Sequence, residues 1–346
     1  MNVIGIITEY NPFHNGHIYH INKIKEMFPN SIIICVTSSS FSQRGELSIL
    51  NKWEKTNISL NNNIDLVIEL PYFFTVQSAD IFAHASLQIL NEFKIDTLVF
   101  GSESNNIDLL TKYANKNNYE DKLPPNDILG VSYIKEIIKN RYNIKTISIK
   151  RTNSYNDREN NSNIVSASNI REKFYNNKNI KKYIPSITYE YLKNKKIDNN
   201  KYLDLLKYKI INNKLTNYLD VNDELSNKLK NNIFKYNNIE SLIKNTKTKR
   251  YNYSKISRML NHILASLLKA DTSKTKNIEY IRILGFNRIG KDYLHNIKKE
   301  INYPIIYNYD KKYVTSIYEL NITKIYSILT NDNIIDKEYK KTVIKF

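Results

Sequence analysis

Short apolar runs and longer segments with helical periodicity alternate over the first 150 residues. Five apolar runs are bounded by turn residues, as is typical of buried strands. They are Val3–Ile7, Ser31–Thr37, Asp65–Pro71, Asp96–Glu103 and Ile144–Ile149. Between them, segments such as Gln77–Phe93 repeat apolar residues at helical spacing, which indicates helices that bury one face. The alternation predicts an α/β fold with a doubly wound parallel sheet over residues 1–175.

The pattern changes near residue 176, where the chain becomes polar and rich in Lys and Tyr. Tyr183–Leu192, Tyr202–Tyr218 and Asn222–Phe234 have helical character, and Ile256–Leu267 places apolar residues on one helical face. We therefore predict two domains: an α/β domain over residues 1–175, and a mainly α-helical domain over residues 176–346.

The two parts differ sharply in charge. Residues 1–150 hold 14 Lys and Arg against 15 Asp and Glu; of the chain totals of 52 and 34, this leaves 38 basic and 19 acidic residues in residues 151–346. A near-neutral first part suits chemistry on a small molecule. A strongly basic second part suits a polyanion such as RNA.

Cysteine content and the lengths of the apolar segments indicate the cellular compartment. The single cysteine, Cys35, excludes an internal disulfide and lies in an apolar run, where a buried structural thiol is expected. Neither a signal peptide nor a stretch of about 20 apolar residues is present. We expect a cytoplasmic protein without a membrane partner.

The turn after the first strand carries the most specific chemistry. Asn11-Pro12 ends the strand, and His14, Gly16 and His17 open an amphipathic helix. Free N–H groups at a helix start attract anions, and Gly16 would let a phosphate approach the backbone. Zinc ligation by His14, His17 and His20 has a possible spacing, but the helix lacks the carboxylate of a zinc protease motif. We therefore predict a nucleotide phosphate site and no metal held by protein side chains.

Other candidate ligand contacts follow later strands. Gly101 ends the fourth strand, where an adenine or ribose could lie against the backbone. Asn126 or Asp127 is expected to cap the next helix, which leaves the other side chain for a ligand. Small hydroxyl residues, including Ser168, precede Arg171 at a later helix start and could bind a triphosphate. No P-loop motif is present.

Two strings of residues carry a resemblance to a known family. A strand followed by His-x-Gly-His is similar to α/β nucleotidyltransferases that activate substrates as adenylates. The longer string Glu-Tyr-Asn-Pro-Phe-His-Asn-Gly-His, residues 9–17, resembles the bacterial tRNA(Met) cytidine acetate ligases, which make N4-acetylcytidine in the anticodon of elongator tRNA(Met) from ATP and acetate. The loop Gln43-Arg44-Gly45, the Lys-Arg-Tyr stretch at residues 249–251 and the segment Ile283–Gly290 also resemble this family. In the last of these we expect structural turn residues.

The resemblance implies a Rossmann-like nucleotidyltransferase fold of the His-x-Gly-His type with a tRNA-binding helical domain. His14 and His17 would be catalytic by stabilising charge on phosphoryl oxygens. The implied ATP contacts are Ile7, Thr8, Glu9, Tyr10, Asn11, Pro12, Phe13, His14, Asn15, Gly16, His17, Ile18, Tyr19, His20, Gly101, Asn126 and Arg151, with Ser168 and Arg171 as further phosphate contacts. Mg²⁺ is expected with ATP. The expected RNA contacts are Lys247, Lys249, Arg250, Tyr251 and Lys255, where basic side chains would meet phosphates and the aromatic ring would stack on a base.

The implied reaction is that of an ATP-dependent ligase. ATP and acetate would give acetyl-adenylate and diphosphate, and N4 of the wobble cytidine would then take the acetyl group and release AMP. Two other functions stay open at this point. One is a small-molecule nucleotidyltransferase, which would leave the basic half without a purpose. The other is a non-catalytic RNA-binding protein with a relic nucleotide fold.

Overall fold

The fold is built around one mixed sheet. The computed structural model describes residues 1–116, 123–151, 163–340 and 343–346, and within these ranges eight strands form a single sheet. The strands are β1 (Val3–Thr8), β2 (Ile32–Ser38), β3 (Leu66–Leu70), β4 (Thr97–Ser102), β5 (Lys145–Lys150), β6 (Ile281–Phe286), β7 (Ile305–Ile306) and β8 (Ile344–Lys345). The five predicted strands are β1 to β5, with ends shifted by no more than one residue.

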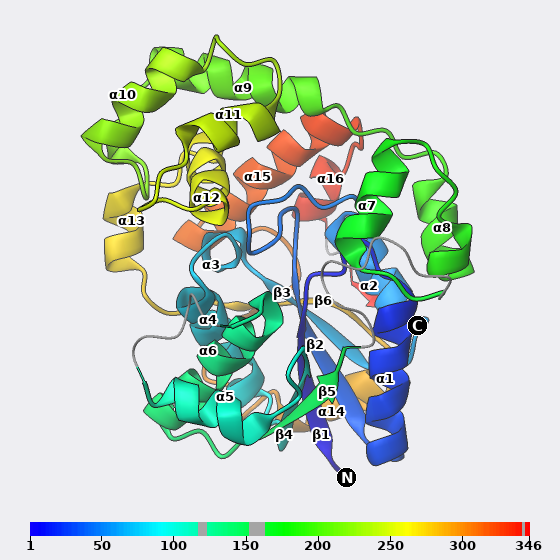
Figure 1. Ribbon diagram of the computed structural model, residues 1–346. Helices are drawn as coiled ribbons and strands as arrows, with labels where there is room; N and C mark the ends of the chain where they lie inside the picture. The colour runs from blue at the N-terminus through cyan, green and yellow to red at the C-terminus, as the bar shows by residue number, and fades with distance from the viewer. Residues whose placement is uncertain (117–122, 152–162, 341–342) are drawn as a thin grey trace.

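Helices cover both faces of the sheet and continue above its carboxyl end (Figure 1). Those that follow the first strands are α1 (Asn15–Met27), α2 (Lys52–Leu60), α3 (Tyr72–Thr75), α4 (Ala79–Glu92), α5 (Ile107–Ala114), α6 (Pro125–Asn140) and α7 (Ala167–Tyr175). The later helices are α8 (Ser186–Leu192), α9 (Asn199–Asn212), α10 (Asp223–Asn232), α11 (Ile239–Thr246), α12 (Tyr253–Leu264), α13 (Lys269–Lys274), α14 (Arg288–Ile297), α15 (Val314–Thr330) and α16 (Ile335–Tyr339).

The strand order places a switch point beside β1. The order is β5-β4-β1-β2-β3-β6-β7, and β1 pairs in parallel with both β2 and β4. The chain leaves β1 in one direction to form β2 and β3, and later returns to the other side for β4 and β5. Ligands of such sheets bind outside the carboxyl ends of the strands at this point. The residues after β1 therefore lie where a ligand is expected.

Alternation along the strands separates two cores. Ile32, Ile34 and Val36 of β2 pack with α4 and α6, whereas Ile33 and Cys35 pack with α1, α2 and α7. Strands buried on both faces read as continuous apolar runs, which is why the sequence reveals them. Cys35 is buried, as predicted, and burial raises the pKa of its thiol to about 12.

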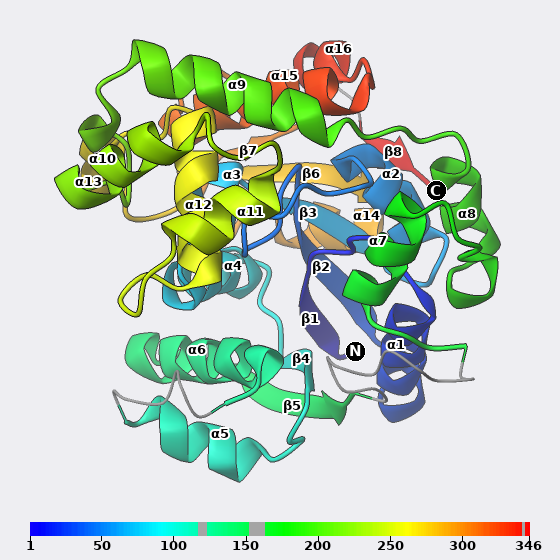
Figure 2. The same ribbon diagram turned by 45° about the horizontal axis from the view of Figure 1, so that its top comes forward.

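The last quarter of the chain returns to the sheet, which the sequence pattern did not predict. Ile281–Phe286 forms β6, antiparallel to β3, rather than a turn. Figure 2 shows α9 to α13 grouped beside the carboxyl ends of the strands, with α15 and α16 above β6. The predicted helix over Tyr202–Tyr218 ends earlier, at Asn212. The division into domains at residue 175 stays a prediction, since β6 to β8 belong to the same sheet as β1 to β5.

A buried ion network fastens β6 and the C-terminal helices to the sheet. The Lys52 ammonium on α2 lies 2.5 Å from Glu69 of β3, 3.0 Å from Glu319 of α15 and 2.6 Å from Glu338 of α16. Arg282 of β6 pairs with Glu338. Burial disfavours the charge on Lys52, but the surrounding carboxylates prevail and raise its pKa. Each charge in the network therefore depends on elements distant in sequence.

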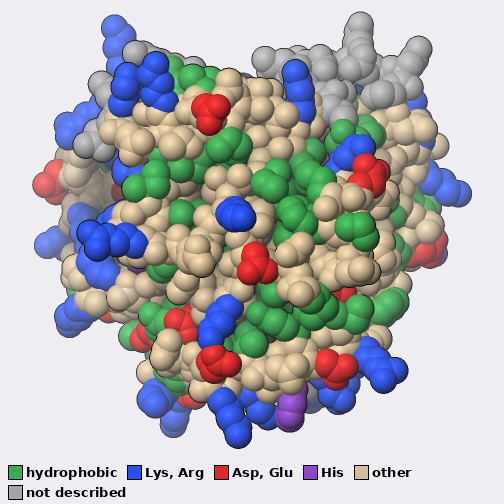
Figure 3. Space-filling model, turned by 90° about the horizontal axis from the view of Figure 1, so that it is seen from below, with side chains coloured by type: hydrophobic (Ala, Val, Ile, Leu, Met, Phe, Trp, Pro, Cys, Tyr) green, Lys and Arg blue, Asp and Glu red, His purple; other side chains and the backbone are tan. Residues whose placement is uncertain are grey.

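The outer surface is mixed in character. On the face seen from below, hydrophobic side chains gather in groups between scattered charged side chains of both signs (Figure 3). None of the helices in the described ranges combines the length and apolar character needed to cross a membrane.

Candidate active site

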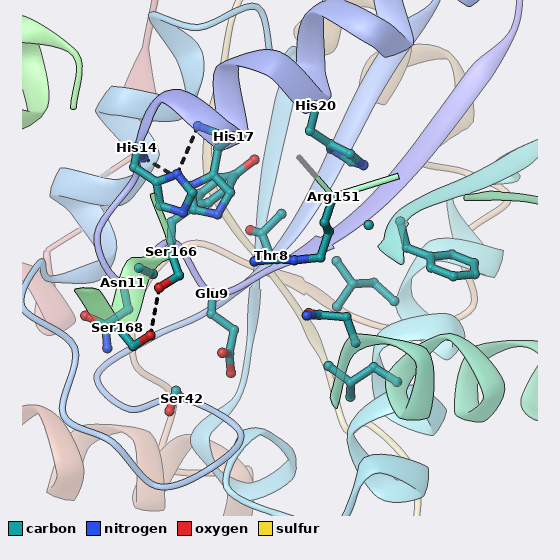
Figure 4. Close-up of a pocket in the computed structure, with 18 of the residues that line it drawn as sticks. Thr8, Glu9, Asn11, His14, His17, His20, Ser42, Arg151, Ser166 and Ser168 are labelled. Carbon is teal, nitrogen blue, oxygen red and sulfur yellow. Dashed lines mark hydrogen bonds between the residues drawn. The ribbon is translucent and has the colours of Figure 1, made fainter. Parts of the chain in front are cut away.

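A pocket of about 250 Å³ opens at the carboxyl ends of the strands around β1. Figure 4 shows His14, His17, Glu9, Arg151, Ser166 and Ser168 converging on it from β1, α1, β5 and α7. The predicted ATP contacts that line it are Ile7, Thr8, Glu9, Tyr10, Asn11, His14, Gly16, His17, Tyr19, His20, Gly101, Asn126, Arg151, Ser168 and Arg171. Residues distant in sequence thus form one cavity.

The remaining predicted ATP contacts, Pro12, Phe13, Asn15 and Ile18, lie outside the pocket lining. Phe13 is fully buried and packs edge-on against Tyr10. The Asn15 amide donates to the carbonyl oxygens of Asn163 and Lys182. In this structure Phe13 and Asn15 hold in place the turn between β1 and α1.

The two histidines of the motif are held in defined tautomers. The N–H of Gly16 donates to Nδ1 of His14 at 3.0 Å, and the N–H of His14 donates to Nδ1 of His17 at 3.1 Å. Because each Nδ1 accepts a hydrogen bond, the proton of each neutral ring lies on Nε2. The ring of Tyr10 packs edge-on against His17 with centroids 4.7 Å apart. The pair therefore offers two oriented N–H donors to the pocket.

Burial keeps these imidazoles uncharged. It lowers the pKa of His14 to about 3, with further lowering by the charges of Arg151 and Arg171. The pKa of His17 is also well below the usual value, because of burial first and then the neighbouring His14 and Arg151. Burial and Arg151 lower the pKa of His20 to about 4. Neutral imidazoles beside arginines can donate hydrogen bonds to a phosphate without adding a further charge of their own.

Gly16 is required by the protein itself. A Cβ on Gly16 would lie 2.7 Å from Cε1 and 2.9 Å from Nδ1 of His14. From the sequence we predicted that the missing side chain of Gly16 leaves room for a phosphate, but in the structure the His14 ring fills that room. Gly16 still lines the pocket, but its lack of a side chain serves to seat that ring.

Two arginines border the imidazoles. Arg171 on α7 donates to the carbonyl oxygen of Asn11 at 2.8 Å and pairs with Glu46. Arg151 follows β5, and its Nε lies 3.9 Å from Glu103. Ser166 caps α7 by accepting from the N–H of Asn169, as the hydroxyl-rich start of this helix suggests. Cationic groups and a helix N-terminus therefore lie on the same side of the pocket.

The capping predicted for α6 is wrong. Pro124 occupies the N-cap position, and neither Asn126 nor Asp127 caps the helix. Asp127 is buried and accepts from Oγ of Ser102 at 2.5 Å and from the N–H of Glu103 at 3.0 Å. Asn126 donates to Glu103 at 2.5 Å and lines the pocket. Proline fixes the helical start, which frees Asp127 to support the end of β4.

The loop between β2 and α2 joins the pocket to α12. The carbonyl oxygen of Gly45 accepts from Oγ of Ser257 at 3.2 Å and from Nδ2 of Asn261 at 2.7 Å. Gly45 has a φ of +78°, and a Cβ there would lie 2.8 Å from Asn261 Nδ2. The conformation and the close contact both require glycine. Ser42, Gln43, Arg44 and Glu46 of this loop line the pocket.

Several lining residues were not among the predicted contacts. Gln43 and Ser42 follow a predicted strand, so their position was a usable signal. Phe82, Phe100, Leu129 and Tyr133 bring an apolar wall from α4, β4 and α6. The helical periodicity around Phe82 and Tyr133, and the apolar run that contains Phe100, indicate only that these residues are buried, so sequence patterns give no sign of their second role.

The predicted RNA contacts lie around the start of α12. Lys247, Lys249 and Arg250 are exposed, and Lys255 is half-buried. Tyr251 is 5% exposed, and Arg250 and Lys255 lie near its ring, at 5.4 and 5.2 Å from the ring centroid. Its hydroxyl accepts from Nδ2 of Asn222. Tyr251 thus has no open face for a base in this conformation, in contrast to the stacking role expected from sequence.

The described residues contain no group of three or more His, Cys, Asp and Glu side chains that could hold a metal ion. His14 and His17 lie with ring centroids 3.8 Å apart, and their Nδ1 atoms accept backbone hydrogen bonds. The geometry favours hydrogen bonding to an anion.

Comparison with known proteins gives consistent matches over the chain. A family model described as HIGH nucleotidyl transferase matches residues 1–124 and 115–342. The tRNA(Met) cytidine acetate ligase of Clostridium acetobutylicum is 34% identical, over 99% of this chain and 100% of that protein. The ligase of the same name from Fusobacterium nucleatum is 38% identical, over 87% of this chain and 86% of that protein.

A solved structure shows the same fold. The crystal structure of Thermotoga maritima TmcAL bound with alpha-thio ATP has a TM-score of 0.87 and 24% identity, with 100% of both chains covered. The family model spans most of the chain, and relatives at 34% and 38% identity align over 99% and 87% of it. The chain therefore belongs to the tRNA(Met) cytidine acetate ligase family of HIGH nucleotidyl transferases.

Proposed function

We propose that this chain acetylates N4 of the wobble cytidine of elongator tRNA(Met), with ATP and acetate as co-substrates. Acetate first attacks the α-phosphorus of ATP and gives acetyl-adenylate and diphosphate. The cytidine amine then takes the acetyl group and AMP leaves. Adenylation is needed because a carboxylate is a poor acyl donor. The single observation that carries the proposal is the joining of His14, His17, Arg151 and Arg171 in one pocket.

The pocket residues have roles that follow from their geometry. Nε2–H of His14 and of His17 donate to phosphoryl oxygens as charge builds up on them, and Arg151 and Arg171 offset the charge of the triphosphate. The other lining residues predicted from sequence complete the ATP site, with the Glu9 carboxylate turned away from the histidines that meet the phosphates. These donors are oriented before the substrate binds, so little reorganisation is needed during the reaction.

Mg²⁺ is expected to accompany ATP. Phosphate oxygens would supply its ligands, because Glu46 is paired with Arg171 and the other pocket carboxylate, Glu9, points away from the histidines. When bound, the ion would offset phosphate charge.

Residues 176–346 are proposed to hold the tRNA. Lys247, Lys249 and Arg250 present exposed charge at the start of α12, and α12 contacts the pocket loop through Gly45. This arrangement connects an RNA-binding surface to the catalytic pocket, which a small-molecule nucleotidyltransferase would not need. An anticodon base is already in a loop, so its extrusion costs little.

Incubation with ATP, radiolabelled acetate and bulk tRNA tests the proposal. We expect label in tRNA, and nucleoside mass spectrometry should locate it in N4-acetylcytidine. The double variant His14→Ala/His17→Ala serves as the matched control. Absence of label from RNA with the wild-type protein would refute the proposal, whereas label with the double variant would refute the role of the histidines.

A further inference from the structure

The pocket has two chemically different sides. His14 and His17 come from α1, on the sheet face that carries the core of α1, α2 and α7. Phe82, Phe100 and Tyr133 belong to the core on the opposite face, and the rings of Phe100 and Tyr133 pack edge-on with centroids 5.7 Å apart. The first side suits phosphates. The second is an aromatic wall of the kind that holds a flat base.

Glu9 lies between these two sides. It follows β1, and Figure 4 shows its carboxylate turned away from His14 and His17 and toward Ser42. The N–H of Gln43 donates to Oε1 of Glu9 at 2.5 Å. The described residues form no hydrogen bond to Oε2, the second oxygen. One carboxylate oxygen is thus fixed to the backbone and the other is available to a ligand.

A role of Glu9 toward the triphosphate is unfavourable. A carboxylate repels phosphate oxygens, and this one faces away from the imidazole side. The negative charge of Glu9 also contributes to the raised pKa of Tyr133, after burial of that phenol, so the carboxylate is close to the aromatic wall. A ligand that meets both Glu9 and this wall must be flat and must donate a hydrogen bond.

We propose that Glu9 is the catalytic residue that accepts the proton of the cytidine amine during acetyl transfer. This inference rests on the proposed function and assigns a group to its second step. Glutamate accepts hydrogen bonds from cytosine N4, and extruded bases are held between aromatic and apolar side chains. With cytosine against Phe100 and Tyr133, N4–H donates to Oε2 of Glu9, and the nitrogen faces an acyl group held on the phosphate side.

Acetyl transfer forms two bonds, C–N and the O–H bond of protonated Glu9, and breaks two. The N4 nitrogen attacks the acetyl carbonyl carbon and forms the C–N bond, and the C–O bond to the phosphate of acetyl-adenylate breaks. AMP leaves with the electron pair of that bond. The N4–H bond also breaks, and its proton passes to the Glu9 carboxylate. The exocyclic amine of cytosine is a weak nucleophile because its lone pair is delocalised into the ring, so removal of the proton during attack is needed.

The surroundings of Glu9 set its protonation. Burial raises its pKa, while the Gln43 N–H and the charge of Arg44 oppose the shift; Glu46 of the same loop raises it and Lys55 on α2 lowers it. Tyr133 faces it from α6, and the α1 histidines are neutral. A raised pKa makes the carboxylate a stronger base, and the transfer rate should increase with pH as Glu9 ionises.

Separate assays of the two steps test the inference. Acetate-dependent exchange of labelled diphosphate into ATP reports the first, and single-turnover transfer from enzyme-bound acetyl-adenylate to tRNA reports the second. For Glu9→Gln, which keeps the acceptor for the Gln43 N–H, the ratio of transfer to exchange should fall at least about 100-fold. The pH-dependent increase in transfer should disappear. Glu9→Asp, which keeps a carboxylate, should recover part of the ratio.

Glu136→Gln is the matched control, because Glu136 lies on α6 outside the pocket lining and pairs with His84. Its ratio should equal that of the wild type. Three results in Glu9→Gln would overturn the role of Glu9 and leave the proposed function intact. They are an unchanged ratio of transfer to exchange, an equal loss of both steps, and a retained increase of transfer with pH. If the wild-type protein performs neither step, the proposed function itself fails.

Discussion

The backbone N–H of His14 donates to Nδ1 of His17, and this one hydrogen bond fixes the side chain of the second histidine through the main chain of the first. Together with the Gly16 N–H on His14, it leaves both Nε2 atoms as donors. Sequence spacing places the two residues on one helical turn but gives no information on tautomers.

Removal of either donor should slow adenylation. We expect His14→Ala and His17→Ala each to reduce acetate-dependent diphosphate exchange by about 10²- to 10³-fold, the usual effect of losing one such donor. His295→Ala, which changes an exposed histidine on α14, is the control and should exchange at the wild-type rate. Full exchange by His14→Ala would exclude its donor role.

The buried histidines should make stability depend on pH. The pKa of His20 is about 4 in the folded protein against 6.5 for the ordinary side chain. Between these values the unfolded chain binds a proton that the folded chain does not, so the free energy of unfolding falls as pH decreases from 6.5 and levels off below 4. Denaturant titrations at a series of pH values should show that the free energy of unfolding changes less with pH in His20→Leu than in the wild type. His295→Leu should keep the wild-type pH dependence.

Alanine at position 16 should uncouple stability from activity. The new Cβ would displace the His14 ring, so ATP affinity and exchange should fall, whereas alanine favours the helix that begins at residue 15. Calorimetric titration with ATP and thermal unfolding measure the two effects.

At Gly101 the nearest protein atom to an added Cβ is Arg151 Cγ at 3.5 Å, an ordinary contact, so a loss of ATP affinity in Gly101→Ala would show that the ligand itself lies against this residue.

The exposed basic residues should govern the salt dependence of tRNA binding. In the triple variant Lys247→Ala/Lys249→Ala/Arg250→Ala, affinity should fall, and the slope of log affinity against log salt should decrease by about 0.7 to 0.9 for each phosphate that the variant no longer neutralises. The rate of diphosphate exchange in the triple variant should equal that of the wild type. Tyr251→Phe removes only the hydroxyl that contacts Asn222 and should bind tRNA normally. An unaltered slope in the triple variant would place the RNA elsewhere.

The ion network should dominate stability. Lys52→Met leaves Glu69, Glu319 and Glu338 buried without their shared cation and should lower the free energy of unfolding by about 3–5 kcal/mol. Lys23→Met removes an exposed helix pair with Glu26 and should leave the free energy of unfolding nearly unchanged. Equal effects of the two substitutions, measured by chemical denaturation, would contradict the importance of the network.

The sequence was informative wherever a local pattern determines structure. Strands buried on both faces, such as Ile32–Ser38, appear as apolar runs, and the histidine motif opens a helix as expected. Ile281–Phe286 was missed because six residues with a glycine give no local sign of their antiparallel partner, β3. The contacts of Lys52 with α15 and α16 depend on tertiary packing alone.

The same limit applies to the site. Position after a strand identified Gly101 as a candidate and the family resemblance identified Arg151, and the structure places both in the pocket lining. The aromatic wall was not found, because Phe82 and Tyr133 follow helical spacing like any core residue. Tyr251 shows the opposite limit: a tyrosine among lysines suggests stacking on bases, but in this structure its ring is buried, with Arg250 and Lys255 near it.

The return of β6 to the edge of β3 has a consequence for biosynthesis. Glu69 is made early, yet its partner Arg282 lies more than 200 positions downstream, and Glu338 follows later still. A partly synthesised chain therefore exposes one border of its nucleotide-binding sheet together with an uncompensated charge. The sheet that carries the pocket is therefore completed only after α8 to α13 have been synthesised, because these helices precede β6 in the chain.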